Sequence, residues 1–419
     1  MLKSPGCWPM DFTPTRARAH ARLAEFLPAA GRRYADTRNH DDGPADGGRG
    51  NVSQLSPWLH AGLIGQAEVL EAVFGAHSPR AAEKFVAEVF WRIYFKGYLE
   101  QRPAIWADYC AGRDNALAAV NCNTGLRTAY AEATEGRTGI EAFDVWAQEL
   151  VATGYLHNHA RMWFASIWIF TLKLDWRLGA DFFVRHLMDG DAASNTLSWR
   201  WVAGLHTKGK HYLARPDNIG RYTAGRPEGA LSAEGLAEDA EPLEEPQDYA
   251  RQKLDLPAPV AATDLAQPFA LLLHDEAAHH APLALPAAPA LVIGATRPLA
   301  RSPGEIGTAA SAFAEGAVAS GLADAAAAYA CPAAEWREGE PLAPLLDEAG
   351  IVRLALPYLP TGWTRDALWP DLAPLVAGGR VVTLLGDLDR ATWPHAKAGF
   401  FGVAKAIEGI VRECGIGGG

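Results

Sequence analysis

The chain has 419 residues, of which 49% are hydrophobic and 21% are charged. This balance is typical of a globular protein with two or three domains, and it excludes a disordered or collagen-like chain. The sequence has no uncharged apolar run of 18 residues and no secretory signal pattern, which predicts a cytoplasmic protein with no membrane partner. Its five cysteines are scattered without a Cys-x-x-Cys pair, so we expect no disulfide framework, zinc site or iron–sulfur cluster.

The net charge of −11 is concentrated in the second half of the chain. Residues 1–220 carry 24 Lys and Arg against 23 Asp and Glu, whereas the remaining residues carry 14 against 26. A strongly acidic protein is a poor nucleic-acid binder, but the nearly neutral first half can still offer a local basic face. Ten of the fourteen tryptophans also lie within the first 201 residues.

Residues 12 to about 215 are predicted to be helical. A first helix is expected after Thr13, which has the residue type of an N-cap. A second is expected over residues 78–100, with capping from Ser78 and Pro79. A longer helical pattern follows and is interrupted at Gly154. No alternating strand pattern stands out in this half of the chain.

Two further regions follow. Residues 222–264 are acidic, rich in Pro and Ala and poor in aromatic residues, which predicts a linker with at most a short helix. After them, short apolar runs such as "FALLLHD" and "ALVIGAT" alternate with helical segments. We therefore predict a helical domain over residues 1–221, a linker over 222–264, and an α/β domain with a mostly parallel sheet over 265–419. The glycines show no phosphate-loop pattern.

Residues 189–204, "DGDAASNTLSWRWVAG", bring two acids, an amide and two indoles close together. One interpretation is a metal site that uses the acids and His186, but no further ligands follow at metal-binding spacing, and we expect no metal. A second is a loop between helices with the indoles in the core. A third is a pocket for a large aromatic cofactor, in which the acids bind hydroxyl or ring N–H groups and Asn195 faces the ring.

The residues before this stretch favour the cofactor pocket. Asn158 and Arg161 are three positions apart and therefore share a helical face. Arg161 can pair with Asp189 or Asp191, with a phosphate, or with the edge of a flavin.

Residues 154–204 resemble the FAD-binding domain of the DNA photolyase/cryptochrome family over a long collinear span. Upstream, "NVSQLSPWLHAGLIG" is similar to the family's phosphate-holding Thr-Ser-x-Leu-Ser-Pro segment, and "FVAEVFWRIYFKGYL" to its Glu-x-x-Trp-Arg-x-Phe/Tyr helix. Tyr34, followed by Arg38, lies where the family has a Tyr before an Arg-rich loop. The resemblance covers residues 12–220 and implies an all-α FAD-binding domain of photolyase type.

The resemblance also implies which residues hold FAD. The phosphates would bind at Ser53, Leu55 and Ser56, where Val52 replaces the family's Thr. Asn195 would face the flavin N5 atom. The other residues implied to surround the folded cofactor are Tyr34, Phe85, Arg92, Tyr155, Asn158, Arg161, Asp189 and Asp191, and among these Phe85 and Tyr155 stand where the family has tryptophans.

The same resemblance implies light-driven repair of cyclobutane pyrimidine dimers by electron transfer from reduced FAD. The implied dimer pocket consists of Glu88, Trp91, Asn158, Met162 and Trp201. Glu88 would hydrogen-bond or protonate a base carbonyl, and the two indoles would stack on the flipped bases. The branch that repairs 6-4 products has histidines at the positions of Asn158 and Met162, so their absence favours cyclobutane dimers.

UV-damaged DNA is therefore the expected partner of a monomeric protein. Residues 206–215, "HTKGKHYLAR", are the best candidate for a DNA strand contact. Further candidate phosphate contacts are Arg102, Arg127 and Arg185. The alternative function is a cryptochrome-like FAD photoreceptor without repair activity.

The route by which the flavin is reduced in light is left open by the sequence. Trp199 and Trp176 match the first two residues of the family's tryptophan triad, but the third position falls near Asn123, which cannot carry an electron hole. Substitutes for the third residue, each of which also fits ordinary core, are Trp106, Trp163 and Trp168.

The order of the domains differs from the family's usual order. Photolyases begin with an α/β domain, whereas here an α/β unit comes last and the chain begins with the FAD domain. We expect a circular permutation in which the acidic linker joins the old C-terminus to the old N-terminus, and an unrelated α/β domain is the alternative. The family's α/β domain can hold an antenna chromophore, a folate or a deazaflavin, and nothing in this sequence identifies one.

Overall fold

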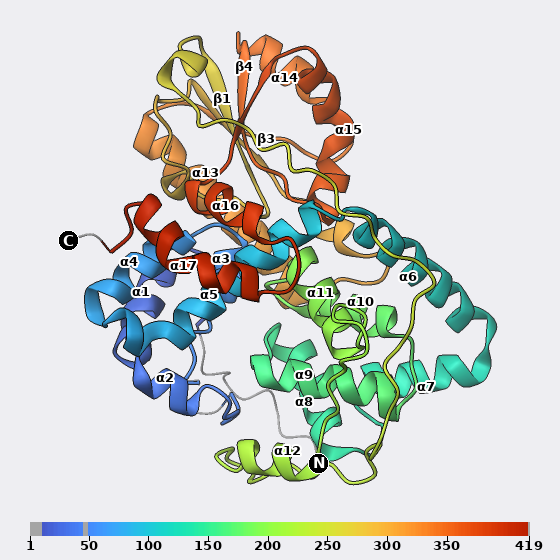
Figure 1. The fold of residues 1–419 in the computed structure, drawn as a ribbon. Coiled ribbons are helices and arrows are strands. Elements are labelled where there is room, and N and C mark those ends of the chain that lie inside the picture. Colours follow the sequence, from blue (N-terminus) through green and yellow to red (C-terminus); the bar gives the residue numbers. More distant parts are fainter. Residues whose placement is uncertain (1–10, 45–48, 418–419) are drawn as a thin grey trace.

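The computed structural model describes residues 11–44 and 49–417, which form a helical part followed by an α/β part (Figure 1). The helices of the first part are α1 (Arg16–Phe26), α2 (Arg32–Thr37), α3 (Ser56–His60), α4 (Gln66–Ala76), α5 (Pro79–Glu100), α6 (Ala104–Cys122), α7 (Thr124–Thr134), α8 (Glu141–Thr153), α9 (Asn158–Ser166), α10 (Trp176–His186), α11 (Ala192–Val202) and α12 (Pro216–Thr223). A π-helical turn, Ile167–Thr171, extends α9.

Capping residues explain where two of these helices begin. Helix α5 starts after Ser78 as predicted, and the Ser78 side chain accepts a hydrogen bond from the Ala81 amide. The prediction for α1 was wrong by two residues, because its N-cap is Thr15. The Thr13 hydroxyl is instead bonded to Asp11, so it does not cap the helix.

Gly154 interrupts the long helical pattern as predicted. It ends α8 with a φ of 69°, a left-handed conformation that favours glycine. A Cβ atom at this position would also lie 2.9 Å from the Cβ of Ala309 in the α/β part. The chain therefore turns here and restarts as α9, which carries Asn158 and Arg161.

The α/β part contains a five-stranded sheet in which every neighbouring pair is parallel, with the order β3-β2-β1-β4-β5. This confirms the predicted α/β class. Strand β1 lies at the centre and is buried along its whole length. The elements are β1 (Phe269–His274), β2 (Leu291–Ala295), α13 (Thr308–Tyr329), β3 (Ala333–Glu335), α14 (Leu342–Glu348), β4 (Arg353–Pro357), α15 (Trp363–Ala377), β5 (Val381–Leu384), α16 (Asp387–Thr392) and α17 (Phe401–Glu413).

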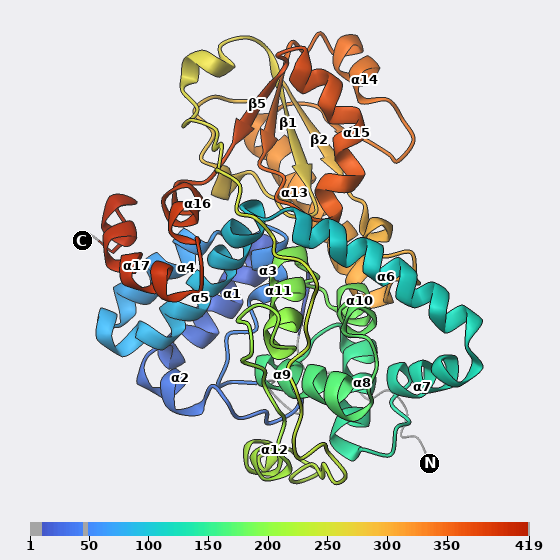
Figure 2. The same ribbon diagram turned by 45° about the vertical axis from the view of Figure 1, so that its right-hand side comes forward.

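The two parts are packed against each other where α16 and α17 contact α5 and where α13 contacts α10 (Figure 2). Gly97 of α5 allows the close approach of Trp393, because a Cβ atom there would lie 2.6 Å from the indole ring. The turn between α10 and α11 is held by the α/β part, since Trp363 Nε1 donates to Gly190 O at 2.9 Å and Arg301 Nη1 donates to Leu187 O at 2.7 Å. Thus the sheet domain positions the turn that carries Asp189 and Asp191.

Residues 224–261 run along the helical part toward the sheet without forming a helix or strand (Figure 2). Polar contacts fasten them to the helices. Arg200 forms an ion pair with Glu245, the Tyr249 hydroxyl donates to Asp108 at 2.8 Å, and the Gln252 amide donates to the Gln101 carbonyl at 2.8 Å. None of the helices in the described part of the chain combines the length and apolar character needed to cross a bilayer.

A buried network of four charged side chains joins distant segments of the helical part. Arg49 lies 2.7 Å from Asp41 and 2.5 Å from Glu149, and Arg226 lies 2.8 Å and 3.2 Å from the same two acids. All four residues are buried, and Trp146 Nε1 donates to Asp41 at 3.2 Å. The network fixes the loop that precedes Ser53 against α8 and the end of α12.

Candidate functional site

Asp189 and Asp191 flank Gly190 in the turn between α10 and α11, and both are buried. Asp189 pairs with Arg161 of α9, with 3.1 Å between Oδ2 and Nη2. The sequence left open whether Arg161 pairs with Asp189 or Asp191, and in the structure it pairs with Asp189. Burial raises the pKa of the Asp189 carboxyl, but Arg161 and the Ser56 hydroxyl lower it by more. The net pKa is below its usual value, so this carboxyl is ionised.

Asp191 caps α11 and faces cations from α5. Its Oδ1 accepts a hydrogen bond from the Ser194 amide at 2.7 Å, while Oδ2 lies 3.1 Å from Arg92 Nη2 and 3.7 Å from Lys96 Nζ. Burial raises the pKa of Asp191, and these two cations together bring it well below its usual value. Lys96 also lies 2.6 Å from Glu276, which follows β1.

A possible metal site in this region is filled by the protein's own cations. The ligand atoms of His60, Asp191 and Glu276 lie within 4.8 Å of one another, which is close enough for one metal ion. The Lys96 ammonium, however, contacts both carboxylates and supplies the positive charge that a metal would bring. We therefore describe the group as an ion-pair cluster. His186, considered with the two acids in the metal interpretation of the sequence, does not belong to this trio.

Asn195, at the first turn of α11, is held in one orientation. Its Nδ2 donates to the Ala180 carbonyl at 2.8 Å, and this hydrogen bond assigns which end of the amide is the nitrogen. The Oδ1 atom is therefore left to accept a hydrogen bond. An acceptor at this position suits a protonated ring nitrogen, such as N5 of a fully reduced flavin.

Several buried polar atoms around this turn have no hydrogen-bond partner among the described residues. They are Asp189 Oδ1, Arg92 Nε and both ring nitrogens of His60, whereas Asp191 Oδ2 lies in ion pairs with Arg92 and Lys96. Unpartnered buried polar groups are costly and call for a ligand or water. The set contains both acceptors and donors, so it fits the edge of a ring system such as isoalloxazine, which offers both.

The residues expected at the cofactor phosphates lie in the loop before α3. Arg22 organises this loop, because its guanidinium donates to the carbonyls of Ser53 and Val52, each at 2.8 Å. Ser53 Oγ accepts from the Leu55 amide at 3.4 Å, and Leu55 itself is buried. Ser56 begins α3.

Aromatic rings line the region between this loop and α5. Phe85 meets Tyr34 edge-to-face, with ring centroids 5.2 Å apart. Tyr155 lies under the guanidinium of Arg161, whose Cζ is 5.5 Å from the ring centroid. The two residues that replace family tryptophans therefore keep aromatic faces next to expected cofactor residues.

The expected dimer-pocket residues already have partners within the chain. Glu88 forms an ion pair with Arg38, yet burial outweighs this cation and raises the pKa of the Glu88 carboxyl. Trp91 stacks on Phe400, with ring centroids 4.0 Å apart and planes at 11°. Sequence reasoning did not anticipate Phe400, because the contact joins residues more than 300 positions apart.

The remaining pocket residues lie on α9 and α11. Asn158 is exposed at the start of α9, and Met162, one turn later, is half-buried. Trp201 stacks on Tyr212, with ring centroids 5.9 Å apart. Tyr212 belongs to the basic segment 206–215, so this segment lies beside an expected base-stacking indole.

The candidate DNA-contacting cations differ in availability. Lys208 is exposed and pairs with Asp248, and Lys210 is exposed. Arg185 is held by Asp181 at 3.0 Å and has only 12% of its side chain exposed, so it does not act as a free phosphate contact. The expectation for Arg185 is therefore corrected, because burial and a carboxylate partner remove it from the surface set.

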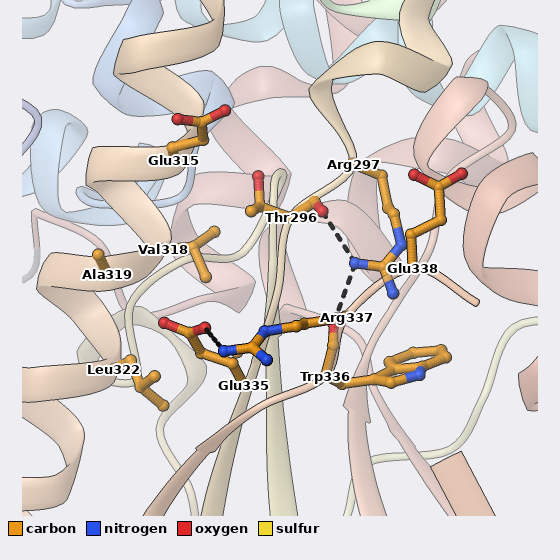
Figure 3. Close-up of a pocket in the computed structure, with 11 residues that line it drawn as sticks. Thr296, Arg297, Glu315, Val318, Ala319, Leu322, Glu335, Trp336, Arg337 and Glu338 are labelled. Atoms are coloured by element: carbon orange, nitrogen blue, oxygen red, sulfur yellow. Dashed lines mark hydrogen bonds and ion pairs between the residues drawn. The ribbon is translucent and has the colours of Figure 1, made fainter. Parts of the chain in front are cut away.

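A pocket of about 350 Å³ opens where β2 and β3 end beside α13 (Figure 3). Arg297 lies on its wall, donates to the carbonyls of Thr296 and Trp336, and has its Cζ 5.1 Å from the Trp336 ring centroid. Three carboxylates also line it, those of Glu315, Glu335 and Glu338. The carboxyl ends of parallel strands are a common ligand-binding position, so this pocket is a second candidate site.

Comparison with known proteins shows what the helical part of the chain is similar to. Residues 85–223 match the family model described as the FAD binding domain of DNA photolyase. The chain is 33% identical over 245 residues to a deoxyribodipyrimidine photo-lyase of Streptomyces griseus, with 55% of this chain and 50% of that protein covered. It is 34% identical over 201 residues to one of Thermus thermophilus, with 48% and 45% covered. The chain thus spans about half the length of the curated relatives it matches.

Similar solved structures include a bacterial class III photolyase from Agrobacterium tumefaciens, at 28% identity and a TM-score of 0.41, with 53% of this chain and 47% of that chain covered. Another is a cryptochrome of Synechocystis sp. PCC6803, at 23% identity and a TM-score of 0.41, with 50% and 43% covered. Residues 85–223 are therefore similar to the FAD-binding domain of DNA photolyase, and about half of this chain is similar to deoxyribodipyrimidine photo-lyases.

Proposed function

We propose that the chain is a flavoprotein that uses blue light and reduced FAD to split cyclobutane pyrimidine dimers in DNA. The observation that carries this proposal is helix α5. It presents Glu88 and Trp91, the pocket residues, immediately before Arg92, which lies 3.1 Å from Asp191 in the cofactor cluster. One rigid helix thus connects a substrate-binding face with a flavin-binding face.

The residues described above support FAD as the cofactor. Arg161, Asp189 and Asp191 would hold the flavin edge, and Asn195 Oδ1 would accept a hydrogen bond from N5–H of the reduced flavin. Bound, reduced FAD would supply the electron that opens the cyclobutane ring and would regain it afterwards. Exclusion of water by the buried acids and aromatic rings would protect this exchange.

Glu88 and the indoles would hold the flipped dimer. The raised pKa of Glu88 means that its carboxyl keeps a proton more readily than a free one, so it suits donation to a base carbonyl. Trp91 and Trp201 offer stacking surfaces, each worth about 1–3 kcal/mol per base. Lys208 and Lys210 lie near Tyr212 in sequence and would contact the DNA backbone.

The alternative is an FAD photoreceptor without repair activity. Two contacts favour this alternative. Phe400 covers a face of Trp91, and Arg38 pairs with Glu88. Both residues would have to be released for a dimer to bind. The assay that separates the two functions is dimer loss from an oligonucleotide after the protein is chemically reduced and illuminated with blue light. A protein that retains FAD but shows no dimer loss would be a photoreceptor.

Replacing Glu88 with Ala is expected to lower the repair rate about 100-fold, because the proton donor to the base is lost. Flavin absorbance should be unchanged, since Glu88 is paired with Arg38 and not with the cofactor cluster. Glu88→Gln should retain more activity than Glu88→Ala, because an amide can still donate a hydrogen bond. Loss of flavin from both variants would contradict the placement of Glu88 in the substrate pocket.

We infer that the pocket at β2 and β3 is the place for an antenna chromophore. Its lining contains three carboxylates and two arginines, Arg297 and Arg337, and Arg337 pairs with Glu335, so it offers polar groups of both signs to such a chromophore. The absorbance spectrum of chromophores released from the purified protein distinguishes FAD alone from FAD with a second chromophore. Release of FAD alone would contradict the assignment of this pocket to a second chromophore.

We also propose that the α/β part over residues 265–419 is the family's antenna-type domain in permuted order, joined to residues 1–221 by the segment 222–264. Helices α16 and α17 pack on α5, Trp363 and Arg301 hold the turn before α11, and the joining segment forms no helix or strand from 224 to 261. These features support a domain that belongs to the flavin site.

A further inference from the structure

We propose that electrons reach the flavin site from the surface of α7 through Tyr130, Trp168 and Trp199, in that order. This inference rests on the proposed function, because it requires FAD beside Asn195. It replaces Trp176 as the second carrier and assigns a tyrosine as the terminal donor.

The contact between Trp199 and Trp168 forms the inner step of this route. Trp199 lies one helical turn after Asn195 on α11, and its ring meets that of Trp168 edge-to-face with centroids 6.2 Å apart. Both indoles are buried. Gly179 makes the contact possible, because a Cβ atom there would lie 2.3 Å from the Trp199 ring and 3.0 Å from the Trp168 ring.

Tyr130 of α7 forms the outer step. Its ring lies edge-to-face with Trp168, with centroids 6.0 Å apart, and the side chain is half-buried. The family's third tryptophan position falls near Asn123, which caps the same helix. The terminal donor has therefore moved about two turns along α7, from a residue that cannot carry a hole to one that can.

The surroundings of Trp168 suit a transient positive charge. Its Nε1–H donates to the Asp175 carbonyl at 2.9 Å, and a carbonyl oxygen favours positive charge on the donor. Trp176 is less suitable, because Arg177 and Arg200 have their Cζ atoms 5.1 Å and 6.0 Å from its ring centroid. Asp108 and Asp175 pair with Arg177, and Glu245 pairs with Arg200, and these carboxylates reduce the repulsion.

The path through Trp176 also leads into the interior. Its ring contacts Tyr109 at 5.9 Å, and Tyr109 contacts Trp106 at 5.2 Å. Tyr109 is buried and its hydroxyl has no hydrogen-bond partner among the described residues. A tyrosine releases its phenolic proton when it is oxidised, so an enclosed hydroxyl without an acceptor is a poor terminus.

Electrons and protons balance along the proposed route. Trp199 gives one electron to the bound flavin, Trp168 refills Trp199, and Tyr130 refills Trp168. Tyr130 then loses its phenolic proton to water on its half-exposed side, because the Arg185 guanidinium, 2.9 Å from the hydroxyl, donates a hydrogen bond and cannot accept a proton. The result is a neutral tyrosyl radical, which an external thiol reduces by transferring a hydrogen atom.

The test compares Trp168→Phe, Tyr130→Phe and the matched control Trp176→Phe in the full chain with bound oxidised FAD. The first readout is electron paramagnetic resonance of the protein radical trapped after illumination, and the second is the rate of flavin reduction in light with thiol present. We expect a tyrosyl signal in the wild-type protein and in Trp176→Phe, and none in Trp168→Phe or Tyr130→Phe. The light-driven rate should fall about tenfold or more in Trp168→Phe and change less than about twofold in Trp176→Phe.

Opposite results overturn the route. Loss of photoreduction in Trp176→Phe but not in Trp168→Phe would place the electron path through Trp176. A tyrosyl signal that persists in Tyr130→Phe would assign the terminal donor to another tyrosine. Because Tyr130 is half-buried, this substitution tests the route without repacking the core. If chemically reduced protein repairs dimers normally and Trp168→Phe keeps the wild-type rate of light-driven flavin reduction, the route is rejected but the proposed function stands. A protein that binds no FAD would reject the proposed function as well.

Discussion

Replacing Asp41 with Asn is expected to destabilise the folded protein by about 3–5 kcal/mol, because it removes a buried carboxylate that two buried guanidinium groups share. Asp41 lies 2.7 Å from Arg49 and 2.8 Å from Arg226, and all three side chains are buried. Glu149 remains beside both arginines, and the partly exposed Glu228 remains 2.7 Å from Arg226. The midpoint and slope of a urea unfolding curve measure the effect.

Asp114→Asn is the matched control for this substitution. Asp114 pairs with Arg113, but 58% of its side chain is exposed, so its loss should cost at most about 1 kcal/mol. Equal stability of the two variants would contradict the importance of the buried network. Loss of FAD from Asp41→Asn is also expected, since the network fixes the loop that leads to Ser53.

Acid should weaken the same region of the wild-type protein. Asp41 is buried, yet Arg49 and other cations bring its pKa below the usual value, so its contribution is present above the unfolded pKa and is lost as the pH falls through the folded one. Burial lowers the pKa of the neighbouring His157 to about 3. Because the unfolded chain binds this proton at a pKa of about 6.5, the free energy of unfolding falls as the pH drops from about 6.5 toward about 3. Stability should therefore decline continuously below neutral pH.

Asp191→Asn is expected to release most of the FAD and to cost about 3–5 kcal/mol, because Arg92 and Lys96 lose their shared carboxylate in a buried setting. Asn is as good an N-cap as Asp, so the hydrogen bond to Ser194 can be kept and the effect isolates the charge. The ratio of flavin to protein absorbance after gel filtration measures cofactor retention, and the melting temperature measures stability.

Asp175→Asn serves as its control. Asp175 caps α10 through a hydrogen bond from the Arg177 amide at 2.7 Å, but 38% of its side chain is exposed. This variant should keep FAD and lose less than about 1 kcal/mol of stability. If both variants retain flavin equally, Asp191 does not contribute to the cofactor site.

Local patterns predicted the secondary structure well where the signal itself was local. The Ser78 cap and the Gly154 break depend on a few neighbouring residues, and both appear as expected. Strand β3 was not predicted, because its three residues, Ala333–Glu335, contain no long apolar run and are ordered by pairing with β2. The start of α1 was misplaced because two threonines compete for the cap, and hydrogen bonding to Asp11 decides between them.

Contacts between distant residues could not be predicted from the sequence. Arg226 lies within the stretch predicted as a linker, yet it is buried against Asp41, and nothing in its neighbours signals that contact. The contacts that Glu276 and Phe400 of the α/β part make with α5 could not be predicted either, because no neighbouring residues signal them. Composition describes what a segment resembles on average, whereas a single ion pair depends on tertiary packing.

The helical part and the α/β part are held together by direct contacts as well as by residues 224–261. The sheet and the helices are joined directly by Trp363 to Gly190 and by Arg301 to Leu187, as well as by Lys96 to Glu276. A single protease cut near residues 253–261 would therefore sever the polypeptide while the two fragments still migrate as one particle in gel filtration. The chain should consequently tolerate new termini at this point, as a split protein reassembled from two separately encoded pieces.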